Sequence, residues 1–125
     1  MKYEIHVNNN QDAFNKAARG VLLQGCASVS DNGSCLYDGP HGTACGIGWL
    51  LDPVTRGEID NESIGDLLAE GSVVCYNASP ALLQHLQDAH DCAYQASKHN
   101  GLAFIPLFIK NMESVAESFE FLPQG

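Results

Sequence analysis

The stretch SPALLQHLQDAHDCAYQASKHNG, residues 79–101, carries the longest helical pattern of the sequence. Ser79 followed by Pro80 is typical of a helix start, because serine caps the first free N–H groups and proline fits the first helical position. The closing Asn-Gly pair is typical of a helix end, which places the last helical residue at about His99. At about 100° per residue, six apolar side chains fall on one face: Leu82, Leu83, Leu86, Ala89, Ala93 and Tyr94. We therefore predict a long helix with one side in a core.

The polar residues of this helix allow two interpretations. His90 falls near the middle of the apolar face, where a histidine is usually a core residue with one ring nitrogen hydrogen-bonded to a neighbour; a ligand or acid–base role is the alternative. His85, Asp88 and Cys92 share the opposite face, and these residue types can bind zinc. The outer two of these lie about 10 Å apart along the axis, which is unusual geometry for one ion. We expect an exposed polar stripe, or a contact with another subunit.

Shorter patterns flank the long helix. Alternation of Tyr3, Ile5 and Val7 with polar residues predicts a strand, and SVVCY at residues 72–76 predicts another. Asn32-Gly33 predicts a turn that could close a hairpin between residues 27–29 and 34–37. Caps, apolar stripes and stop signals predict further helices. One is capped by Asn10 and runs to about Gln24, with a stripe of Phe14, Ala17, Ala18, Val21 and Leu22. The others are Ala44 to Leu51, capped by Thr43; one after Asp52-Pro53; Asp60 or Asn61 to Glu70; and one after Pro106 to about Phe119.

The predicted elements define the fold class. We expect a mainly α fold, with α+β as the alternative, made of four to five helices and one small two- or three-stranded sheet. The length of 125 residues favours one domain over residues 1–125. Five cysteines is an odd number, which favours free thiols over a disulfide framework.

The charge balance excludes some partners. Six basic and fifteen acidic residues give a net charge of −9, so direct binding of nucleic acid or of an anionic membrane surface is not expected. No apolar run approaches the roughly 18 residues of a membrane span, and the N-terminal residues lack the apolar region of a signal peptide. Residues 51–75 hold six acidic side chains and one arginine. This acidic segment could face a basic partner, although a solvated surface is the simpler interpretation.

The segment SCLYDGPHGTACGIGWLL, residues 34–51, invites a metal or thiol interpretation. Cys35, His41 and Cys45 are weak candidate metal ligands, because the nine residues between the cysteines exceed the two to four of a zinc knuckle. Cys45 would lie in the first turn of the predicted helix, where the dipole lowers a thiol pKa, with His41 or His85 as base. We favour a buried, space-filling Cys45 and predict no catalytic residue and no cofactor. Whether the chain is an enzyme stays open, and we favour a non-enzymatic role.

A ligand-binding turn is the third interpretation of residues 34–51. DGPHGT before a helix N-terminus offers backbone N–H groups to an anion, without the lysine of a P-loop. Aromatic side chains on either side could stack a base. The candidate ligand-binding residues are Tyr37, Gly39, Pro40, His41, Gly42 and Trp49.

Two motifs in this chain resemble a family of small proteins of tailed phages and prophages that has no assigned activity. The first has the form C-x-Y-x-G-P-x-G-x-x-C-x-x-G and is matched by Cys35, Tyr37, Gly39, Pro40, Gly42, Cys45, Gly48 and, beyond it, Leu50. The second, L-Q-x-x-H-D, is matched by Leu86, Gln87, His90 and Asp91, with Leu83 as the family's leucine three residues before it. Asp38 and Ala44 stand where the family pattern has arginine and lysine. The resemblance implies a viral accessory protein in the host cytoplasm.

Three hypotheses of function follow. The first, which we prefer, is a phage-type accessory protein that binds and modulates a host factor, such as a component of antiviral defence. The second is a small-ligand binder that sequesters a nucleotide signal. The third is a Cys/His metal or thiol site. The oligomeric state is open, and a homo-oligomer is compatible with the sequence.

Overall fold

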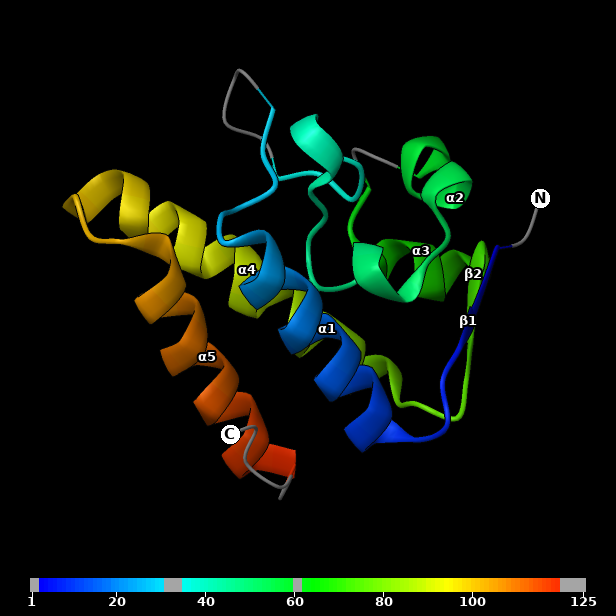
Figure 1. Cartoon of the computed structure of the whole chain (residues 1–125). Helices are drawn as coiled ribbons and strands as arrows, with labels where there is room; N and C mark the ends of the chain where they lie inside the picture. The colour runs from blue at the N-terminus through cyan, green and yellow to red at the C-terminus, as the bar shows by residue number, and fades with distance from the viewer. Residues whose placement is uncertain (1–2, 31–34, 60–61, 120–125) are drawn as a thin grey trace.

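The computed structural model describes residues 3–30, 35–59 and 62–119, and within them the predicted mainly α class is confirmed. Five α-helices surround one core, with a two-stranded parallel sheet at one side (Figure 1). In chain order the elements are β1 (Tyr3–His6), α1 (Asn10–Gln24), 3₁₀ turns at Pro40–Gly42 and Gly48–Leu50, α2 (Pro53–Glu58), α3 (Ile64–Glu70), β2 (Val73–Tyr76), α4 (Pro80–Asn100) and α5 (Phe104–Phe119).

Local sequence signals explain the helix ends. Four helices begin after a side chain that accepts a hydrogen bond from the backbone N–H three residues on: Asn9, Asp52, Ser63 and Ser79. Three helices end at a glycine in the left-handed conformation: Gly25, Gly71 and Gly101. Ser63 caps α3, so this helix begins later than predicted; the expected start at residues 60–61 lies outside the described residues. Helix α5 begins two residues before Pro106, which the first turn of a helix tolerates.

Helix α4 crosses the middle of the fold and supplies much of its core. Leu82, Leu83, Leu86, Ala89 and Ala93 are buried as predicted, and Tyr94 is half-buried. Helix α5 folds back along α4 and buries its own apolar stripe there (Figure 1). On α1, four of the five stripe residues are buried, but Leu22 is 40% exposed. No helix within the described ranges has the length and apolarity needed to cross a membrane.

Strands β1 and β2 pair in parallel, from Tyr3 opposite Val73 to His6 opposite Tyr76. Ile5 and Val73 point into the core and are almost fully buried. The predicted hairpin is reduced to one antiparallel bridge between Val29 and Cys35, and its turn at residues 31–34 lies outside the described residues.

The prediction of a helix from Ala44 to Leu51 is wrong. Residues 43–45 are extended or irregular, and the only helical turn in this stretch is the 3₁₀ turn at Gly48–Leu50. The carbonyl oxygen of Ala44, which in a helix would accept from the N–H of Gly48, accepts instead from Gln24 Nε2 at 2.8 Å. A Cβ on Gly48 would lie 2.6 Å from the carbonyl oxygen of Tyr37, so glycine allows two backbone segments to touch here.

Candidate functional site

The two motifs of the sequence meet in space, where the loop before α2 lies against α4. The backbone N–H of Ser28 donates to His90 Nε2 at 3.0 Å. Gln87 Nε2 donates to the hydroxyl of Tyr37 at 2.7 Å, and Gln87 Oε1 accepts from the N–H of Ile64 at 2.9 Å. The L-Q-x-x-H-D motif therefore joins the loop and the start of α3 to the central helix.

These contacts also determine the tautomer of His90. The imidazole is fully buried, and its Nε2 accepts the Ser28 N–H, so the ring proton of the neutral form sits on Nδ1. From there it donates to Asp91 Oδ1 at 2.8 Å. The predicted core role of His90 is confirmed, with both ring nitrogens bonded to neighbours rather than one.

Cys35 completes a group of metal-ligand types with His90 and Asp91, whose ligand atoms all lie within 4.8 Å of one another. A metal ion bound to His90 Nδ1 would require the ring proton to lie on Nε2. There it would point at the N–H of Ser28, so two hydrogen-bond donors would face each other. Burial, followed by the nearby Asp91 carboxylate, raises the pKa of the Cys35 thiol far above its usual range. The group therefore fits a hydrogen-bonded link between loop and helix better than a metal site.

The other candidates, Cys45 and His41, are not members of this group. Cys45 is 2% exposed, as expected for a space-filling residue. The reactive-thiol interpretation needed a helix that begins near Cys45, because its dipole would lower the pKa of the thiol. This helix is absent, so that interpretation loses its physical basis. His41 lies in an exposed turn with a left-handed backbone, at φ 60°.

The predicted ligand-binding residues differ in their surroundings. Tyr37 is 3% exposed, and its hydroxyl donates to the carbonyl oxygen of Glu62 at 2.7 Å while accepting from Gln87. A Cβ on Gly39 would lie 2.2 Å from Ser28 Oγ, so this glycine serves packing. Pro40, His41 and Gly42 form the exposed 3₁₀ turn. Trp49 lines a pocket against α1, and the other five are not among the lining residues of that pocket.

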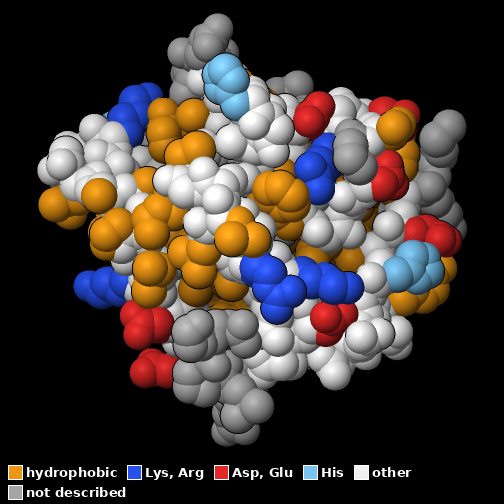
Figure 2. Space-filling model, viewed as in Figure 1, with side chains coloured by type: hydrophobic (Ala, Val, Ile, Leu, Met, Phe, Trp, Pro, Cys, Tyr) orange, Lys and Arg blue, Asp and Glu red, His pale blue; other side chains and the backbone are white. Residues whose placement is uncertain are grey.

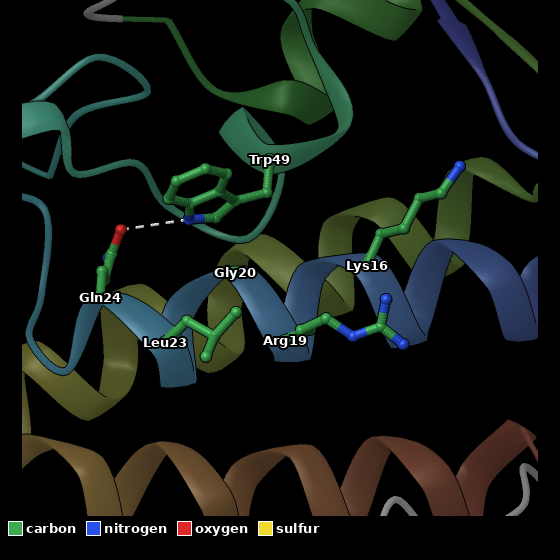
Figure 3. A pocket seen from close by; sticks show the side chains of 6 residues that line it. All are labelled: Lys16, Arg19, Gly20, Leu23, Gln24 and Trp49. Atoms are coloured by element: carbon green, nitrogen blue, oxygen red, sulfur yellow. Dashed lines mark hydrogen bonds between the residues drawn. The ribbon is translucent and has the colours of Figure 1, made fainter.

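That pocket is an open cavity of about 430 Å³ between α1 and the turn that carries Trp49 (Figure 3). Its lining residues are Lys16, Arg19, Gly20, Leu23, Gln24 and Trp49. Gln24 forms one end, where its Oε1 accepts from the indole N–H at 3.1 Å. The same amide side chain bonds the N–H and the carbonyl of Ala44, so it connects α1 to the loop at three points.

The indole of Trp49 is held in place on α1. A Cβ on Gly20 would lie 2.2 Å from Trp49 Cγ, so the ring rests directly on the helix backbone. The guanidinium carbon of Arg56 lies 4.7 Å from the ring centre, a cation–π contact, and Arg56 Nε donates to the carbonyl of Gly48. With Gly20 and Arg56 both against it, the indole is a rigid wall of the pocket.

Positive charge gathers around Trp49 in an otherwise acidic chain. Lys16, Arg19 and Arg56 are three of the six basic residues in the sequence. Lys16 Nζ lies 3.2 Å from Asp12 Oδ2, one turn earlier on α1. Leu23 lies at the rim and is 80% exposed, the largest exposure among the large apolar residues described. The pocket thus combines a fixed aromatic wall, an exposed leucine and cations.

Another groove lies between α4 and α5 and includes the polar stripe of α4. It has a volume of about 320 Å³ and is lined by His85, Asp88, Ala89, Cys92, Asn111, Ser114, Val115 and Ser118. His85, Asp88 and Cys92 are exposed, which confirms the predicted polar stripe. Within the described residues they form no group with metal-ligand distances. Asp88 accepts from Gln84 Nε2, and His85 contacts the edge of Phe119 at 5.6 Å.

Sequence reasoning missed most of the Trp49 pocket, since Lys16, Arg19, Gly20 and Leu23 were assigned only to a helix. One signal was available: Gly20 inside a helical pattern is costly and usually has a packing reason. No protein-family model matches the chain, and no curated protein or solved structure is significantly similar to it. These comparisons therefore assign no function to the chain.

Proposed function

We propose that the chain is a non-enzymatic accessory protein of phage type that acts by binding a host protein. The surface that we assign to this contact is the Trp49 face, defined as Lys16, Arg19, Leu23 and Trp49. Tryptophan and arginine are enriched among the residues that dominate binding energy at protein interfaces. The resemblance of the two motifs to phage proteins is the reason for proposing that the partner is a host protein. It is also the reason for proposing a component of antiviral defence as its class.

One observation carries the proposal: a largely exposed leucine beside a fixed tryptophan and an arginine. An 80% exposed Leu23 gains apolar burial only if another molecule covers it. Figure 2 shows apolar side chains gathered around this region, over α1 and the adjoining half of α5, next to Lys and Arg side chains. Contiguous apolar surface with a polar rim is typical of interaction sites.

The chemistry of the buried polar groups supports binding over catalysis. His90 uses both ring nitrogens in internal hydrogen bonds, and the pKa of Cys35 is raised, which disfavours the reactive thiolate. Tyr37 and Gln87 are likewise engaged with each other. These groups stabilise the loop that presents Trp49.

The test compares two surface substitutions in pull-downs from host lysate. Leu23→Asp places a charge in the Trp49 face, and Val54→Asp makes the same change at a residue that is 71% exposed on α2. We expect a partner to be retained by the wild-type protein and by Val54→Asp and lost by Leu23→Asp, with unchanged thermal unfolding of all three. Equal recovery by the three proteins contradicts the assignment of this face.

A further inference from the structure

We infer that the Trp49 face recognises an acidic segment of its protein partner, in which a carboxylate lies next to a large apolar side chain. This inference rests on the proposed function and adds the chemistry of the partner. It is carried by the arrangement of charge, apolar surface and rigid aromatic wall in one pocket. Each of the three contributes a separate requirement.

Arg19 supplies the requirement for a carboxylate. It is exposed at the pocket, and within the described residues no carboxylate lies within ion-pair distance of it. The Asp12 carboxylate pairs directly with Lys16 and feels the charge of Arg19 only from a longer distance. A guanidinium binds a carboxylate through two parallel hydrogen bonds. The chain has a net charge of −9, so most of its surface repels an acidic group of the partner. The positive charge of Arg19 attracts that group locally.

Leu23 supplies the requirement for an apolar neighbour. It follows Arg19 by four residues on α1, so the two side chains lie one turn apart on the same face of the helix. Both line the pocket with Trp49 (Figure 3). A partner that places its carboxylate on Arg19 therefore brings its next side chains against Leu23 and the edge of the indole.

Trp49 disfavours a nucleotide as the occupant. Base recognition by stacking needs an open ring face. The Gly20 backbone and the Arg56 guanidinium both lie against the indole, and Tyr37 is buried. The Trp49 pocket also lacks the phosphate-binding backbone turn, because the loop of Gly39 and Gly42 is not among its lining residues. A protein carboxylate is the smaller anion that Arg19 can bind alone.

The experiment selects a displayed library of random short peptides on the immobilised protein and measures binding of the enriched peptides through Trp49. This residue is the only tryptophan of the chain, so its emission reports on the pocket when peptides without tryptophan are used. Arg19→Glu tests the charge and Leu23→Asp tests the face. Lys98→Glu, on the last turns of α4, makes the same kind of charge change away from the pocket lining.

We expect enriched peptides in which Asp or Glu lies near a large apolar residue, and a change in Trp49 emission when they bind. Arg19→Glu should weaken their affinity by about ten- to a hundredfold, the range for a hydrogen bond to a charged group. Lys98→Glu should leave it within about twofold, as for a remote surface charge. Selection on Arg19→Glu should favour basic peptides instead.

The remaining outcomes separate the two proposals. Peptides that lose binding in Leu23→Asp but not in Arg19→Glu overturn the acidic partner and leave the Trp49 face as a contact surface. If peptides are enriched but bind Arg19→Glu and Leu23→Asp as well as the wild-type protein, both the acidic partner and the Trp49 face as a contact surface are contradicted. A response of Trp49 emission to nucleotides, abolished by Arg19→Glu, together with no peptide enrichment, overturns the inference in favour of a small ligand.

Discussion

Gly20 on α1 and Trp49 are in such close contact that a single methyl group on Gly20 would lie 2.2 Å from Trp49 Cγ. The absence of a side chain at Gly20 is thus what lets the indole rest on the helix. Because Trp49 also binds Gln24 and packs under Arg56, this contact positions the loop as well as the pocket wall. Several measurable properties depend on it and on the contacts between the loop and α4.

Gly20→Ala should destabilise the protein and displace the indole. The added methyl cannot be accommodated without moving the ring or the helix, at a cost of about 1–3 kcal/mol. Thermal unfolding should occur at a lower temperature, and Trp49 emission should shift to longer wavelength as the ring becomes more exposed. Gly57→Ala is the matched control on α2, because its Cβ would meet only the Asp38 carboxylate, at 3.3 Å. Equal stability of the two variants would contradict the close contact.

Tyr37→Phe should remove a hydroxyl that bridges Gln87 and Glu62. The loss leaves the buried amide of Gln87 with an unsatisfied N–H, at a cost of about 1–3 kcal/mol in the free energy of unfolding. Tyr76→Phe, at a hydroxyl that is 3.3 Å from Glu4 on a 42% exposed residue, should change stability by less than about 0.5 kcal/mol. Urea unfolding of both variants measures the difference. A cycle with Gln87→Leu that shows no coupling would refute the bridge.

The Cys35 thiol should react slowly with alkylating reagents. Burial and the Asp91 carboxylate raise its pKa, so the thiolate is scarce at neutral pH. Asp91→Asn removes the negative charge, and the pKa should fall while the contribution of burial remains. Labelling rates over an alkaline pH series, in a protein whose other cysteines are serine, measure this shift. If Asp91→Asn leaves the labelling rate unchanged at every pH, the carboxylate is excluded as a cause of the raised pKa.

Asp12 should contribute to stability at neutral pH and lose that contribution in acid. The Asn8 N–H, followed by Lys16, lowers the pKa of the folded carboxyl below its usual value. A group with a lowered folded pKa stabilises the fold above its unfolded pKa of about 3.9, and the contribution disappears as the pH falls through the folded pKa. In Asp12→Asn the free energy of unfolding should therefore fall less steeply as the pH is lowered. Urea unfolding at a series of pH values through the folded and unfolded pKa of Asp12 measures this slope. An unchanged slope would show that Asp12 does not contribute.

Local signals predicted the helices well because caps and stops act over a few residues. Gly25 ends α1, and Ser79 with Pro80 begins α4, as predicted. The error at Ala44 to Leu51 has a distant cause: Gln24, twenty residues earlier, donates from Nε2 to the Ala44 carbonyl oxygen, which a helix would need as the acceptor for the Gly48 N–H. The sequence of each strand alone indicates neither the parallel pairing of β1 with β2 nor the register of that pairing.

The site was harder to predict because its parts are far apart in sequence. Spacing around Cys35 and Cys45 drew attention to metal and thiol chemistry, whereas the structure brings Cys35 to His90 and Asp91 on α4. Trp49 was identified as a candidate, but its neighbours on α1 depend on the contact with Gly20. Periodicity showed which residues of α1 face the core and could not show what would cover its other side.

The pairing of Tyr3 with Val73 has a consequence for how the chain folds as it is made. Strand β1 leaves the ribosome first, and at about 5–20 residues per second it waits roughly 4–14 seconds for β2. During that interval its backbone N–H and C=O groups are open to pairing with other chains. Helices α4 and α5 are adjacent in sequence, so their contacts can form as soon as both have emerged. Early release of a truncated chain that ends before residue 73 would therefore leave an aggregation-prone strand.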